Sequence, residues 1–63
     1  MDWQLVLKSM IGDEQAAQAK YKHAVGETSD KELKAVFQQL SDEELVHQRI
    51  LEGWLDRLQK AGK

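Results

Sequence analysis

Two glutamates and a histidine are the residues of this chain whose types and spacing suit metal coordination. Glu44 and His47 are three residues apart, so on a helix both side chains project from the same face. Glu14 adds a second carboxylate from the first half of the chain. Oxygen-rich ligands with one imidazole nitrogen suit iron or manganese, with zinc as a substitute. The three side chains form one site only if the fold brings the two halves of the chain together.

The composition favours long helices as the elements that position these residues. The 63 residues include no proline and no cysteine, so disulfides and thiolate metal sites are excluded. Gly26 suits a helix C-terminus, because glycine tolerates the left-handed conformation that such an end needs. Ser29 with Glu32 forms a capping box for a following helix. We predict one all-α domain over residues 1–63, an antiparallel hairpin with a helix at about 2–25, a turn at 26–29 and a helix at about 30–60.

Side chains recur along both predicted helices at alternating intervals of four and three, the a/d spacing of a packed helical seam. The first helix contributes Trp3, Leu7, Met10, Glu14, Ala17, Tyr21 and Ala24. The second contributes Leu33, Phe37, Leu40, Glu44, His47, Leu51, Trp54 and Leu58. Both seams are apolar except at the two glutamates and the histidine. Counted from the turn, these three lie at nearly the same height, so we expect them to meet.

The apolar stripes are wider than two helices alone can cover, which favours a four-helix bundle made by homodimerisation. A twofold dimer would hold four carboxylates and two imidazoles at one level. This is the ligand set of ferritin-like di-iron and di-manganese proteins. Two divalent cations would cancel the charge of the carboxylates, so we expect two iron ions per dimer, or manganese or zinc. The alternative is a hydrogen-bonded polar layer that only fixes the register of the helices.

At these residues the chain resembles the rubrerythrin-like branch of the ferritin-like superfamily. The segments that carry the resemblance are Gly12–Ala17 with Tyr21, Asp30–Phe37, and Leu40–His47 with its Glu-Glu-x-x-His pattern. The resemblance covers about residues 11–51. A single hairpin that dimerises across a di-iron site is similar to encapsulated ferritin, whereas rubrerythrins hold two hairpins in one chain and add a cysteine-ligated iron.

The resemblance implies that Glu14 and His47 are terminal ligands and that Glu44 bridges the two metals. It also implies a ferroxidase, or a related oxidase or peroxidase, that acts on Fe(II) with O2 or peroxide. Encapsulated ferritins reside in a protein capsule, and the short polar segment after Leu58 does not resemble a capsule-targeting tail. The sequence therefore does not support association with a capsule shell. Tyr21 is either a hydrogen-bond partner of a ligand, a redox-active phenol, or an ordinary core aromatic.

Charge and hydropathy limit the classes of partner and the cellular location that we expect. The net charge is −2 and there is no basic stripe, so nucleic acid is not expected as a partner. No apolar run approaches the ~20 residues of a membrane span, and no signal peptide is recognised, so we expect a cytoplasmic protein. Two other functions fit the same residues: a non-enzymatic protein that binds or handles metal, and a purely structural, self-associating hairpin.

Overall fold

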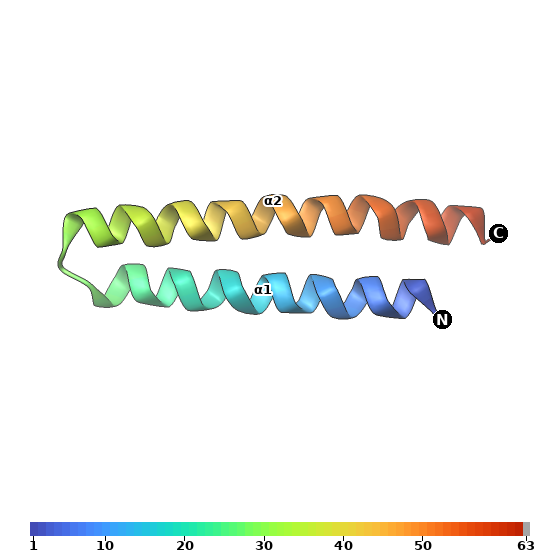
Figure 1. Ribbon diagram of the computed structural model, residues 1–63, viewed down its shortest axis with the longest axis horizontal. Coiled ribbons are helices and arrows are strands. Elements are labelled where there is room, and N and C mark those ends of the chain that lie inside the picture. The colour runs from blue at the N-terminus through green and yellow to red at the C-terminus, as the bar shows by residue number, and fades with distance from the viewer. Residues whose placement is uncertain (63) are drawn as a thin grey trace.

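The computed structural model describes residues 1–62 and forms there an antiparallel hairpin of two helices, α1 (Trp3–Glu27) and α2 (Lys31–Ala61). Figure 1 shows the helices side by side, with the turn at one end and both termini at the other. The hairpin measures 50 × 14 × 13 Å. The predicted all-helical hairpin is therefore confirmed; Lys63, in the predicted polar end, lies outside the described residues. Neither described helix has a stretch apolar enough to cross a membrane.

The helix ends lie close to the predicted positions, but different residues cap them. α1 continues past Gly26 to Glu27, and Thr28 ends it with an extended backbone (φ −94°). No described glycine has a positive φ, so the left-handed glycine cap was a wrong prediction. The N-cap of α2 is Asp30, whose carboxylate accepts hydrogen bonds from the backbone N–H groups of Glu32 and Leu33. A carboxylate at this position also interacts favourably with the helix dipole, which explains why Asp30 replaces the predicted Ser29.

The side chains between the two helices follow a seam that is rotated from the predicted one. In the part of the chain that the structure describes, Gln18 and Ser41 are the two buried residues, and neither belongs to the predicted seam. The Nε2 of Gln18 donates to Oε1 of Gln48 at 2.6 Å and so joins the helices. Residues on the facing sides of the two helices, all of them buried or half-buried, make up what we call the contact seam: Gln4, Leu7, Ile11, Glu14, Gln18, Tyr21, Val25, Phe37, Ser41, Glu44, Gln48, Leu51, Leu55 and Leu58.

The rest of the predicted seam lies along one flank of the hairpin, which we call the open face. Its members are Trp3, Met10, Ala17, Ala24, Leu33, Leu40, His47 and Trp54. Trp3 is 59% exposed, Met10 44% and Trp54 49%. Among the described residues no apolar side chain is buried. Within residues 1–62 a single hairpin therefore has no hydrophobic core of its own, and its apolar stripe lies exposed along the open face.

Candidate metal centre

The fold brings Glu14, Glu44 and His47 together from opposite helices. Because α1 and α2 run antiparallel, the residue halfway along α1 meets the middle of α2. The Nδ1 atom of His47 lies 3.5 Å from Oε2 of Glu14 and 3.6 Å from Oε2 of Glu44. One ligand atom from each of the three lies within 4.8 Å of the others. No other group of three or more such residues with metal-binding spacing occurs within residues 1–62.

These separations are close to those that a shared ion requires. Two donors that each lie about 2.1 Å from one metal are at most about 4.2 Å apart. Both distances from the imidazole satisfy this limit, so a small rotation of the carboxylates would complete the set. The arrangement offers two carboxylate oxygens and one imidazole nitrogen, which is half of the ligands that a di-metal site needs.

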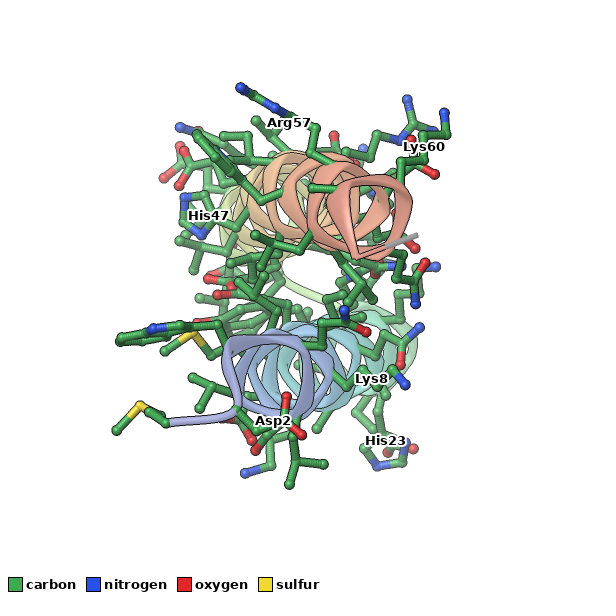
Figure 2. The ribbon with its side chains drawn as sticks, turned by 90° about the vertical axis from the view of Figure 1, so that its right-hand side faces the viewer. Asp2, Lys8, His23, His47, Arg57 and Lys60 are labelled. Atoms are coloured by element: carbon green, nitrogen blue, oxygen red, sulfur yellow. The ribbon has the colours of Figure 1, made fainter. Side chains whose placement is uncertain are left out.

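The site is only half enclosed, and it is exposed on the side of the open face. The side chains of Glu14 and Glu44 are 23% and 21% exposed, whereas that of His47 is 55% exposed. Figure 2 looks along the hairpin from its open end and shows His47 on one flank, opposite the flank of Lys8 and His23. The imidazole therefore stands at the border between the hairpin and whatever covers the open face.

One carboxylate oxygen of the cluster lacks the hydrogen bond that a buried polar atom needs. The Oε2 atom of Glu14 is buried and has no hydrogen-bond partner among the described residues. An unsatisfied buried acceptor costs about 1–3 kcal/mol, and more when it is charged. The Glu14 carboxyl raises the pKa of Glu44 by hydrogen bonding to its protonated form, partial burial raises it further, and His47 opposes both effects. The Glu44 carboxyl therefore retains its proton more readily than an isolated glutamate would.

The raised pKa of Glu44 makes the stability of the metal-free protein depend on pH. The unfolded chain releases this proton near the ordinary pKa of 4.5, whereas the folded chain holds it to higher pH. The contribution of Glu44 to stability is therefore fully present below 4.5 and is lost as the pH rises through the pKa of this group in the folded state. We expect the melting temperature of the metal-free protein, followed by circular dichroism, to fall over this range.

Glu44→Gln is the matched control for this pH dependence, because it keeps the shape of the side chain and removes its titration. Its melting temperature should vary less over the same range. A melting temperature of the parent protein that rises with pH would contradict the prediction. Metal binding should show the opposite trend, since carboxylates and imidazole bind metal only after losing their protons.

A polar contact that sequence reasoning missed lies directly behind the site. Gln18, one turn after Glu14, donates to the carbonyl oxygen of Glu14 at 3.3 Å and to Gln48, the neighbour of His47. Gln48 in turn donates to Glu52 at 3.3 Å. The seven-residue spacing of Gln4, Ile11, Gln18 and Val25, parallel to the predicted seam, is the pattern that indicates this second row.

Tyr21 lies two turns from Glu14 and packs against α2. Its ring is stacked on Phe37, with a centroid separation of 6.4 Å and an interplanar angle of 23°. This contact is the one expected of a core aromatic. The proposed roles of its hydroxyl, as a hydrogen-bond partner of a ligand or as a redox-active phenol, stay predictions.

Comparisons of the chain with protein-family models, curated proteins and solved structures give no match. The ferritin-like resemblance therefore stays a prediction from the motifs.

Proposed function

We propose that two copies of this chain form a four-helix bundle with a di-metal carboxylate site, at which Fe(II) is oxidised by O2 or peroxide. The observation that carries the proposal is the cluster of Glu14, Glu44 and His47 at the edge of an uncovered apolar face. Each hairpin supplies half of a ligand set, and a twofold axis through this layer supplies the other half. Covering the open face would give the hairpin the core that it lacks.

The charges of the layer support binding of two divalent cations. Four carboxylates in one dimer carry four negative charges, and two divalent ions cancel them. Without ions these groups would have to retain protons, which is the tendency that the raised pKa of Glu44 already indicates. Glu14 and His47 would be terminal ligands and Glu44 would bridge, as the rubrerythrin-like motifs imply.

In the proposed reaction Fe(II) is the substrate and the protein supplies the cage. Two Fe(II) ions lose one electron each, and O2 gains both electrons with two protons to leave as hydrogen peroxide. With hydrogen peroxide as the oxidant, the O–O bond breaks and two electrons with two protons give two water molecules. The glutamates and histidines hold the ions together, and the apolar side chains of the open face limit access of water.

The structural alternative, a polar layer that only fixes the register of the helices, is less consistent with the contacts. Gln18 and Gln48 already form a short, neutral hydrogen bond between the helices close to the same level. The carboxylate layer, by contrast, leaves Oε2 of Glu14 without a hydrogen-bond partner. A device for register should satisfy its polar atoms, and the glutamine pair does so where the glutamates do not.

The test is iron oxidation by metal-free protein. Fe(II) added in air should give a ferric absorption band faster than buffer alone, and Glu44→Ala should reduce the rate to that of buffer. Glu43→Ala is the matched control, because it removes an exposed neighbouring carboxylate that lies outside the cluster. Equal oxidation by the parent protein and Glu44→Ala would refute the enzymatic proposal. Stoichiometric metal binding without turnover would instead identify a protein that only carries metal.

A further inference from the structure

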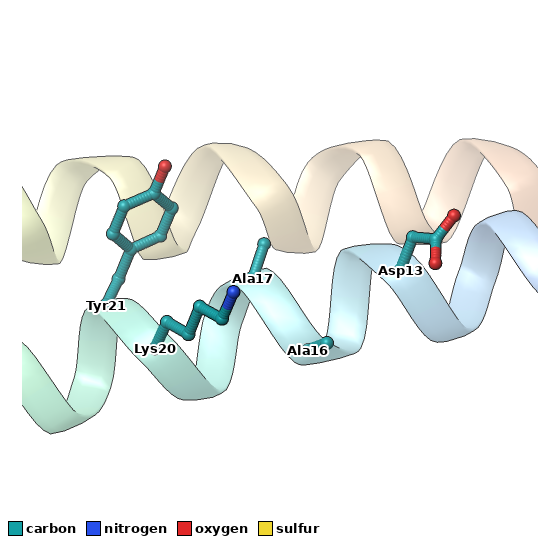
Figure 3. A pocket seen from close by; sticks show the side chains of 5 residues that line it. All are labelled: Asp13, Ala16, Ala17, Lys20 and Tyr21. Atoms are coloured by element: carbon teal, nitrogen blue, oxygen red, sulfur yellow. The ribbon is translucent and has the colours of Figure 1, made fainter.

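A depression on the surface of α1 lies beside the metal centre and is not explained by it. It is lined by Asp13, Ala16, Ala17, Lys20 and Tyr21, and none of the three clustered ligands takes part. Figure 3 shows the two alanines between Lys20 and Tyr21 on one side and Asp13 on the other. Its volume of about 390 Å³ far exceeds the ~30 Å³ share of one water molecule, so a side chain can enter it.

The occupant must come from the body that covers the open face, because Ala17 belongs to that face. A second copy of this chain is the body that completes the metal centre. This argument rests on the proposed function, since the shared ligand layer sets where the twofold axis passes. Consider a twofold axis that passes through the layer and is perpendicular to the helices. It relates each residue of one copy to the same residue of the other copy, at an equal distance on the opposite side of the layer.

That symmetry places Met10 opposite the depression. At about 1.5 Å per residue, Met10 lies about 6 Å from the level of Glu14, towards the N-terminus. The residues that line the depression are centred about 5 Å from the same level, towards the turn. Met10 is 44% exposed and is flexible enough to fill an irregular space.

A second pair along α1 shows the same match of a large side chain with a small one. Trp3 lies about 16 Å from the level of Glu14, and Ala24 lies about 15 Å from it on the other side. Trp3 is 59% exposed, so it is available to a second copy. Alternation of large and small side chains across facing positions is how helices interdigitate without voids.

We propose that α1 packs antiparallel against α1 of a second copy, with each Met10 inserted into the depression at Ala16 and Ala17 of the other copy. Each Trp3 then packs over Ala24 of the other copy. The other twofold arrangement has its axis parallel to the helices and packs α1 against α2 of the other copy without changing the height of any residue. Met10 would then lie level with Ile50, which is 57% exposed, between His47 and Trp54, large against large. The size match therefore selects one orientation of the two hairpins and adds a contact on either side of the metal layer.

Cysteine cross-linking tests the orientation directly, because the chain has no cysteine of its own. In Met10→Cys/Ala17→Cys the Cα atoms of the two cysteines within one copy are about 10 Å apart along the helix. This exceeds the ~7 Å limit between the Cα atoms of a disulfide. Mild oxidation should therefore join two copies, and a covalent dimer should appear on a non-reducing gel. Each single-cysteine variant is a control and should stay uncrosslinked, since its symmetry-related positions lie about 9 Å or more apart.

A reciprocal exchange of size tests the same contact without oxidation. Ala17→Met alone fills the depression and should raise the dimer dissociation constant at least tenfold in analytical ultracentrifugation. Met10→Ala/Ala17→Met restores a large side chain opposite a small one and should recover most of that loss. Ala19→Met is the control, because Ala19 is exposed and lies outside the open face.

The outcomes separate this inference from the proposed function. A dimer that binds two metals but cross-links through Met10→Cys/Ile50→Cys, and not through Met10→Cys/Ala17→Cys, would overturn the orientation and leave the metal centre intact. A protein that stays monomeric with metal present would overturn both. Cross-linking through residues 10 and 17 in a dimer that binds no metal would support the contact and refute the function.

Discussion

Native mass spectrometry of protein purified with Fe(II) should show a dimer that carries two metal ions. The variant with alanine at Glu14, Glu44 and His47 should carry none, because it removes every donor of the cluster. The effect should be complete, since half-sites that retain no carboxylate or imidazole offer nothing to a hard or borderline cation. Elemental analysis should independently give the same ratio of metal ions to protein chains.

The matched control for this experiment keeps the charge change but moves it away from the centre. A triple variant with alanine at Asp42, Glu43 and His23 also removes two carboxylates and one imidazole, all of them exposed. It should keep both metals. An identical loss of metal in the two triple variants would show that net charge, and not the cluster, determines binding.

Leu40→Lys should convert the protein into an unfolded or weakly structured monomer. Leu40 lies on the open face, and a charge there would be buried in the dimer without a partner. Loss of the leucine alone removes about 2–5 kcal/mol at a buried site. Because no apolar side chain is buried within residues 1–62 of the single hairpin, its helices should melt when the dimer dissociates. Circular dichroism and sedimentation should therefore change together.

Val46→Lys is the control for position, since Val46 is an apolar α2 residue that is 57% exposed and lies off the open face. This substitution should leave the helix content and the oligomeric state unchanged. A folded, helical Leu40→Lys monomer would contradict the prediction, because the hairpin would then be stable without a second copy.

The architecture could be predicted from the sequence because the strongest patterns in it are local. The lack of proline, the seven-residue spacing and the polar turn are sufficient to define two antiparallel helices. The level of Glu14, Glu44 and His47 followed from counting residues away from the turn. Each of these inferences needs only helix geometry and one reversal of direction.

The rotation of the helices about their own axes could not be predicted in the same way. The a/d pattern identifies an apolar stripe, but a stripe wider than one contact leaves open which edge meets the neighbouring helix. The structure buries Gln18 and Ser41 in the hairpin and leaves Met10 and Trp54 on the open face. The spacing of apolar residues does not predict that such polar residues are buried. A glutamine pair can nevertheless lie at a helix contact, because its two side chains hydrogen-bond to each other.

The position of the two termini at one end of the hairpin limits how two copies can be fused into one polypeptide. In the proposed dimer the perpendicular axis puts the second hairpin's termini at the far end of the bundle. A connection from the end of one copy to the start of the next must therefore run the length of a hairpin whose longest dimension is 50 Å. At most about 3.5 Å per extended residue, that crossover needs roughly 15 residues. A tandem gene with a short linker would force the metal half-sites apart. A long crossover would let a single chain form the complete di-metal site.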